Sequence, residues 1–175
     1  MTVESAWPDV VDALYSLAVG TSGFQAGDSA GSLIPVYDTT VALAVNDVPG
    51  SLLVIGWPGE PDDGPVPPGE GTQGLATLGT THARDEVGEV NCLASSRLGD
   101  IGTPGDRTQI RLARTTCFAL VNSFGATLRA NPGLGLMGNG YRNVTAYISR
   151  VQPVTWLNEG PVTQVLFTVH YTARI

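Results

Sequence analysis

The sequence predicts a single α+β domain, in which a mixed, mainly antiparallel β-sheet is packed by an N-terminal helix and one long helix. Strict period-two alternation over Thr163–Ile175 predicts a long amphipathic strand. Apolar residues at helical spacing between positions 107 and 130 predict the long helix. At 175 residues, the chain has the length of one ordinary domain, and we expect residues 1–175 to form one unit.

The N-terminal helix is predicted from apolar residues at helical spacing between positions 7 and 18. Ser5 is placed to cap its first turn, Pro8 is tolerated in that turn, and Gly20 is placed to end the helix. We expect a polar, glycine-rich link through Thr21–Ser32 to follow. The apolar stripe is formed by Trp7, Val10, Val11, Leu14, Leu17 and Ala18.

Residues 33–55 have the pattern of short strands separated by turns. Leu33–Tyr37 and Val41–Val45 are predicted to form one strand or two short ones. The turn Asn46–Gly50 then leads into the apolar run Leu52–Ile55. This pattern is typical of a hairpin whose second strand is buried on both faces.

A long segment from Trp57 to about Thr81 has no periodicity. It contains five prolines, many glycines and several acidic residues, among them Asp62 and Asp63. A structureless loop of this length is uncommon in a compact domain, and such loops are typically functional or disordered. We predict that residues 57–81 are mobile in the free subunit and become ordered on contact with a partner.

After this loop, the sequence predicts a strand followed by the long helix. Val90, Cys92 and Ala94 alternate with mostly polar residues, which indicates a strand with one apolar face. The helix begins near Arg107, where Asp106 and Gln109 have the spacing of a capping box, and residues 131–133 end it. Its predicted core stripe consists of Ile110, Ala113, Cys117, Leu120, Val121, Phe124 and Leu128.

Two strands, Asn143–Val151 and Thr163–Ile175, are predicted to close the chain as an antiparallel hairpin. The connection Gln152–Pro161 contains Trp156 and Glu159, and we expect it to form a protruding tip. In the last strand, one face is apolar. The other face carries Gln164, Thr168, His170, Thr172 and Arg174, and it either faces solvent or takes part in an assembly.

Composition and charge exclude some classes of function. The net charge is −7, which argues against a nucleic-acid reader, because such a protein needs a basic footprint to neutralise phosphates. Charged residues make up only 14% of the chain, which suits a protein that covers part of its surface with neighbours, although a glycine- and threonine-rich β protein fits equally well. No apolar run approaches about 20 residues, and no basic and apolar leader is present, so we expect a soluble protein made in the cytosol.

Two glycine-rich motifs resemble sites of catalysis or cofactor binding. Residues 27–31 fit the G-x-S-x-G pattern around Ser29, but the two histidines, His82 and His170, both follow it, and the predicted order of helix and strand around it is wrong for a nucleophile elbow. Residues 133–138 match the dinucleotide fingerprint in letters, yet they leave a helix and enter a strand. We therefore expect no enzyme and no cofactor.

Metal ligands are not predicted either. His82 and His170 lack ligand partners at helical or strand spacing, and Asp62 and Asp63 lack the ordered oxygen ligands of a calcium loop. Cys92 and Cys117 lie inside apolar patterns, with a spacing that matches no metal or redox motif, and are expected to be buried free thiols.

Three arginines of the long helix share one side. Arg107, Arg111 and Arg114 follow one another at intervals of four and three residues. They form either a solvated helix face or a ridge that meets an acidic surface on a neighbouring subunit, because arginine is favoured in interface ion pairs. The sequence leaves both possibilities open.

The order of these elements resembles that of the tail terminator proteins of long-tailed bacteriophages. Several local segments resemble this family as well: Leu52–Trp57 before the acidic loop, Arg84–Glu86 leading into the strand Val87–Ser96, the end of the long helix at Leu128–Pro132 before Gly133–Gly135, and the ending Val165–Ile175. The resemblance covers nearly the whole chain.

The resemblance implies a ring, typically hexameric, that caps the completed tail tube, stops its growth and offers a surface for head and neck attachment. The implied partners are further copies of the chain, the tail tube protein and a neck or head-completion protein, with DNA only passing through. Alternatives are another head–tail connector component and, less favoured, a small serine hydrolase. As interface residues we predict Trp57, Asp62, Asp63, Arg107, Arg111, Arg114, Trp156, Glu159, His170 and Arg174.

Overall fold

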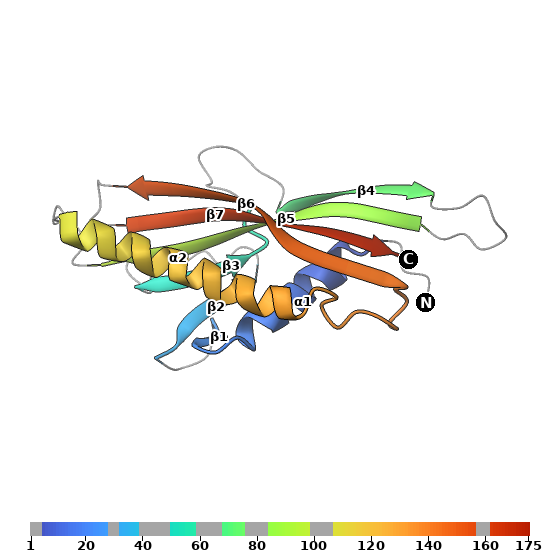
Figure 1. The fold of residues 1–175 in the computed structure, drawn as a ribbon, viewed down its shortest axis with the longest axis horizontal. Helices are drawn as coiled ribbons and strands as arrows, with labels where there is room; N and C mark the ends of the chain where they lie inside the picture. Colours follow the sequence, from blue (N-terminus) through green and yellow to red (C-terminus); the bar gives the residue numbers. More distant parts are fainter. Residues whose placement is uncertain are drawn as a thin grey trace.

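The computed structural model describes residues 5–27, 32–38, 50–58, 68–75, 84–98, 107–156 and 162–175. These residues form two helices and a mixed, mainly antiparallel sheet of seven strands (Figure 1), which confirms the predicted α+β class. In chain order the elements are α1 (Trp7–Val19), β1 (Phe24–Ala26), β2 (Ile34–Asp38), β3 (Ser51–Ile55), β4 (Gly69–Leu75), β5 (Arg84–Arg97), α2 (Arg107–Ala130), β6 (Asn143–Trp156) and β7 (Val162–Arg174).

The sheet is built around three long antiparallel strands. The strand order is β1-β2-β3-β5-β7-β6. β3 and β4 both pair with the same edge of β5: β4 with its first half and β3 with its second half. β5 and β7 pair from Asp85↔Arg174 to Arg97↔Val162, so almost every backbone group along their shared edge has a partner. Only β1, β2 and β3 run parallel to one another.

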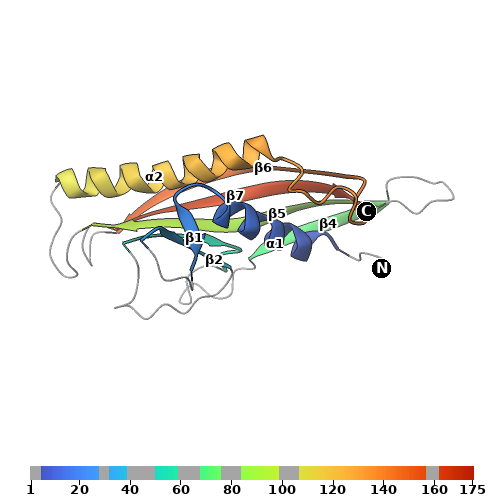
Figure 2. The same ribbon diagram turned by 90° about the horizontal axis from the view of Figure 1, so that it is seen from below.

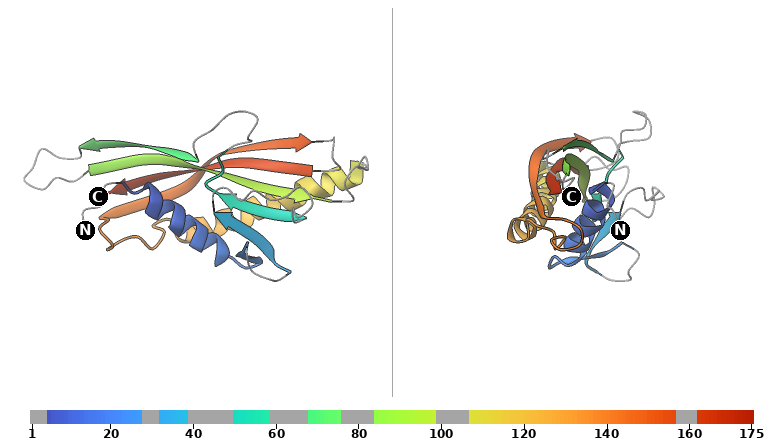
Figure 3. Two further views of the ribbon diagram at one scale, coloured as in Figure 1. Left: turned by 180° about the vertical axis from the view of Figure 1, so that it is seen from behind. Right: turned by 90° about the vertical axis from the view of Figure 1, so that its right-hand side faces the viewer.

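Both helices cover the same face of this sheet, and the sheet curves around them (Figures 2 and 3). The apolar stripe of α2 packs on the inward residues of β5 and β7, where the rings of Phe124 and Phe167 lie 5.9 Å apart. Every predicted stripe residue of α2 is buried except Ile110, which is half-buried. The core therefore lies between the helices and one side of the sheet.

The predicted terminal hairpin is confirmed. β6 and β7 are antiparallel, and the apolar side chains of β7 alternate inward from Val165 to Ala173. β6 reaches Trp156, which pairs with Val162, so the connecting tip is shorter than predicted. Ser149 is an extra residue between the pairs Ile148↔Val169 and Arg150↔Thr168 and forms a β-bulge in this edge strand.

The hairpin predicted within residues 33–55 is wrong. β3 is buried on both faces as expected, but β2 runs parallel to it on one side and β5 lies antiparallel on the other. The predicted strand Val41–Val45 lies outside the described residues. The pattern indicated strands correctly but held no information on which strand β3 would pair with.

Two segments predicted to lack regular structure contain strands. The link Thr21–Ser32 includes β1, and the segment 57–81 includes β4. β1 has only three residues, too few to show a period, and β4 (GEGTQGL) lacks alternating apolar residues and is largely exposed. Pairing with β5 forms β4, because β5 extends beyond the end of β3 and offers a free edge there.

Helix boundaries agree closely with the sequence. α1 is preceded by Ala6, one residue later than the predicted cap Ser5, and Gly20 follows its last turn as expected. α2 begins at Arg107 and ends just before Asn131. Asp106, the proposed capping residue, lies outside the described part of the chain.

Candidate assembly surface

The side chains of β5, β7 and β6 that point away from the helices form one continuous surface, here called the outer sheet face. Because directly opposed residues on antiparallel strands point to the same side, the register fixes its members. They include Asp85, Val87, Glu89 and Asn91 on β5, Thr168, His170, Thr172 and Arg174 on β7, and Asn143, Thr145 and Tyr147 on β6.

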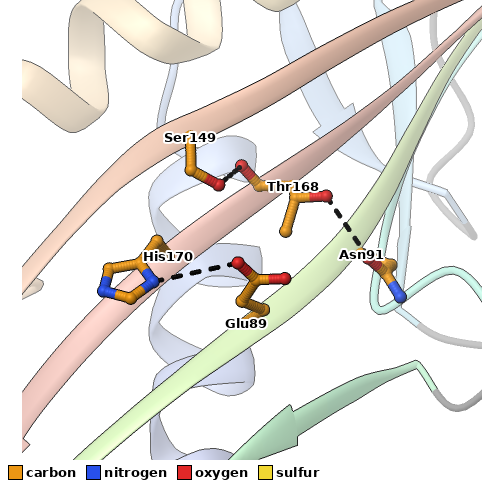
Figure 4. Close-up of polar contacts among 5 residues, drawn as sticks. All are labelled: Glu89, Asn91, Ser149, Thr168 and His170. Atoms are coloured by element: carbon orange, nitrogen blue, oxygen red, sulfur yellow. Dashed lines mark hydrogen bonds and ion pairs between the residues drawn. The ribbon is translucent and has the colours of Figure 1, made fainter.

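An arginine–carboxylate pair and a histidine–carboxylate pair lie across β5 and β7 on this face. Arg174 Nε lies 3.2 Å from Asp85 Oδ1. Two residues along, His170 Nδ1 lies 3.9 Å from Glu89 Oε1, a contact that becomes an ion pair when the imidazole is protonated (Figure 4). All four side chains are partly exposed, so each pair contributes little to folding but orients its groups on the surface.

Large apolar groups are exposed beside these charges. The ring of Tyr147 lies 5.1 Å from the His170 ring, and Tyr147 remains 50% exposed. Val87, on the row between the two charged pairs, is 43% exposed. Exposed aromatic residues such as tyrosine are enriched in protein interfaces, where charged and polar groups surround them at the rim.

A polar group of three residues continues the surface toward the middle of the strands. Thr168 Oγ1 donates a hydrogen bond to Asn91 Oδ1 at 3.4 Å, and the bulged Ser149 donates to the Thr168 carbonyl oxygen at 3.3 Å (Figure 4). Thr168 is buried between its neighbours, whereas Ser149 remains exposed. Beyond them, Leu93 and Leu166 join an apolar cluster with Trp57.

The residues proposed from the sequence fall into separate regions. His170 and Arg174 lie on the outer sheet face, and Trp57 packs at its far end. Arg107, Arg111 and Arg114 are exposed together on α2, which packs on the opposite side of the sheet. Trp156 ends β6, although its side chain, and all of Asp62, Asp63 and Glu159, lie outside what the structure describes.

The described residues contain no group of three histidine, cysteine or acidic side chains that could hold a metal ion. Ser29 and His82 lie outside these residues. Cys92 and Cys117 are buried and free, and burial, as the main cause, raises the pKa of each thiol to about 12. Thiols in this state are unreactive as nucleophiles.

One buried carboxylate was missed at the sequence level. Glu86 is 1% exposed and lies under the start of α1, where both of its oxygens accept hydrogen bonds from the Ala6 backbone N–H. Tyr171 Oη donates to it at 2.6 Å, Gln73 Nε2 at 2.7 Å and Ser5 Oγ at 3.1 Å. Burial alone would raise the pKa of Glu86, but these hydrogen bonds together lower it below its ordinary value.

A signal for Glu86 was present in the alternation of β5. Glu86 is an even number of residues from the inward residues Val90, Cys92 and Ala94, so alternation places it on the core side of the strand. Its partners come from α1, β4 and β7, and no sequence pattern predicts that these meet. The same holds for the outer sheet face, whose charged pairs depend on the register of β5 against β7.

The sequence matches no protein-family model and no curated protein. Within the described residues, no helix is both long and apolar enough to cross a membrane.

Proposed function

We propose that this chain is a structural virion protein of a long-tailed bacteriophage. Copies of it form a ring, of hexameric size, that caps the completed tail tube, ends its polymerisation and provides the surface for attachment of the neck and the filled head. Its partners are other copies of itself, the tail tube protein and a neck or head-completion protein. It works in the virion at the head–tail junction, after assembly in the host cytoplasm.

The outer sheet face is the observation that carries this proposal. It presents oriented charges, an aromatic ring and an exposed valine along three long strands, while both helices lie on the other side. Side chains arranged in this way fit a binding surface for another protein. The order of helix, short strands, long segment, strand, long helix and terminal hairpin supports the resemblance to tail terminators.

A terminator subunit needs several distinct surfaces, because it contacts two neighbours in the ring, the tube on one side and the neck on the other. The exposed arginines of α2 lie apart from the outer sheet face and supply a second such surface. The acidic balance of the chain, with a net charge of −7, suits a ring through which DNA slides without sticking.

The proposal is tested by adding the purified chain to polymerising tail tube protein of the phage that encodes it. We expect tubes that stop growing and that carry a ring of protein at one end, seen by negative-stain electron microscopy. Tubes that grow unchanged, with the chain bound only to portal-side proteins, would instead identify a neck component.

A further inference from the structure

An arginine ridge lies exposed at the start of α2. It consists of Arg107, Arg111 and Arg114, all exposed, and none of them forms an ion pair with a described residue. Leu112, on the same turns, is 54% exposed. The positive end of a helix dipole disfavours a cation in the first turn, so Arg107 does not serve the local stability of α2. The ridge is therefore a surface without a partner in the described part of the chain.

An acidic groove lies between α1 and the turn that follows α2. It is a shallow cavity of about 300 Å³, lined by Asp9, Asp12, Ala13, Ser16, Leu136 and Asn139. Tyr141 Oη donates a hydrogen bond to Asp9 Oδ2 at 2.6 Å, which fixes that carboxylate at the groove. A further carboxylate, Asp38 at the end of β2, lies close to Asp12: burial, and then the charge of Asp12, raise the pKa of Asp38.

Nothing among the described residues neutralises this groove. The contacts Arg174–Asp85 and His170–Glu89 both lie on the outer sheet face, and no described arginine forms an ion pair with Asp9, Asp12 or Asp38. The turn also exposes Met137, which is 62% accessible. Each of the two patches thus combines unpaired charge of one sign with an exposed apolar side chain, and the two signs are opposite.

The two patches lie far apart on the molecule. α2 has 24 residues and is therefore about 36 Å long at about 1.5 Å per residue. The arginine ridge lies on its first turns. The turn that follows its last residue is at the opposite end of the helix, near α1 (Figures 1 and 2), and the acidic groove is lined by residues of that turn and of α1. The patches cannot meet within one chain, but they can meet between two chains arranged head to tail.

We propose that the arginine ridge of one copy docks on the acidic groove of the next copy. This inference rests on the proposed ring and names the contact that builds it. Contacts between two unlike patches repeat from copy to copy and close into a ring when the rotation per subunit allows it. A two-fold contact of either patch with itself would place arginines on arginines or carboxylates on carboxylates.

Charge exchange tests this contact. Arg111→Glu and Asp12→Arg are each expected to weaken self-association about tenfold or more, measured by sedimentation velocity, because each places like charges together. Combining both substitutions in one chain restores opposite charges across the contact and should restore assembly. Arg150→Glu is the control: it makes the same change at an exposed arginine of β6, outside both patches, and should leave assembly intact.

A cross-linking measurement gives a second readout that does not depend on a stable free ring. A chain carrying Arg111→Cys and Asp12→Cys should form a ladder of disulfide-linked multimers on mild oxidation, because the proposed contact brings the two new thiols of neighbouring copies together. The native cysteines are buried and should not interfere. Arg150→Cys with Asp12→Cys is the control and should give no ladder.

The outcomes separate this contact from the ring itself. If Arg111→Glu and Asp12→Arg each still form rings, the arginine ridge does not dock on the acidic groove, although the ring itself is supported. Failure of the combined variant to assemble would contradict the docking in the same way. A wild-type chain that forms no ring, alone or on tail tubes, overturns the proposed function and this contact together.

Discussion

Glu86 is the one charged residue that is fully buried within the described part of the chain, and its position explains how α1 is held on the sheet. The carboxylate accepts hydrogen bonds from the start of α1, from Gln73 on β4 and from Tyr171 on β7. The first N–H groups of a helix lack partners within the helix, and a negative charge near them is favourable. One side chain therefore joins three elements that are distant in sequence.

Replacing Glu86 with glutamine should lower the free energy of unfolding by about 2 kcal/mol, because the amide cannot accept from all of these donors and its own NH₂ group faces them. Urea unfolding followed by circular dichroism measures the loss. Glu89→Gln is the matched control on the same strand: its side chain is 46% exposed, so a change within about 0.5 kcal/mol is expected. Equal losses in the two variants would contradict this role for Glu86.

The effect of Glu86 should also depend on pH. Its pKa is lowered in the folded protein from an ordinary value of 4.5, so its stabilisation is fully present above that pH and is lost as pH falls through the lower folded-state pKa. The stability gap between the wild type and Glu86→Gln should therefore narrow under acidic conditions. A gap that stays constant down to about pH 3 would show that the charge of Glu86 is not what stabilises the fold.

At the scale of elements, β4 and β5 approach each other closely at Gly88. A Cβ atom added there would lie 2.6 Å from the Glu70 carbonyl oxygen and 2.6 Å from ring atoms of Tyr171. Both are closer than packed atoms come, and the obstacle on one side is backbone, which cannot rotate away. Glycine at this position thus lets β4 and the Tyr171 ring pack on the same point of β5.

Gly88→Ala should therefore destabilise the protein by about 1–3 kcal/mol through overpacking. Gly74→Ala is the control in β4, where an added Cβ meets nothing within 4 Å, and it should change stability by less than about 0.5 kcal/mol. Thermal unfolding of the two variants side by side distinguishes them. A Gly88→Ala variant as stable as Gly74→Ala would mean that the close approach is not required.

Elements with strong periodicity were predictable, and those formed by pairing were not. The last strand and the long helix each bury a regular stripe, such as Val165, Phe167 and Val169 on β7, which the sequence displays directly. β1 and β4 are strands because a neighbouring edge was free, and the parallel pairing of β2 with β3 depends on contacts across the chain. Such non-local information is absent from local patterns.

At the scale of the whole molecule, some surface residues could likewise be predicted from the sequence and others could not. His170 and Arg174 were predictable as one polar face, because alternation alone separates them from the core. Their partners Glu89 and Asp85, and the Tyr147 ring beside His170, follow from strand register and were not predictable. The acidic groove joins α1 to a turn more than a hundred residues away, and no spacing in the sequence brings them together.

If the outer sheet face binds the tube or the neck, its exposed aromatic residue should matter for binding and not for folding. Tyr147→Glu should reduce binding to tail tubes strongly, measured by co-sedimentation, while the circular dichroism spectrum stays unchanged. Leu33→Glu is the control, because Leu33 is equally exposed at 50% but lies before β2, outside this face. Normal tube binding by Tyr147→Glu would remove this surface from the proposed interface.

The central claim is that copies of this chain assemble into a closed ring at the end of a tail tube. Electron microscopy of tubes capped with the purified chain, combined with native mass spectrometry of the cap, tests it most directly. The expected result is one closed ring of identical subunits, hexameric in mass, at a single end of each tube. Monomers or open filaments that leave both tube ends free would contradict it.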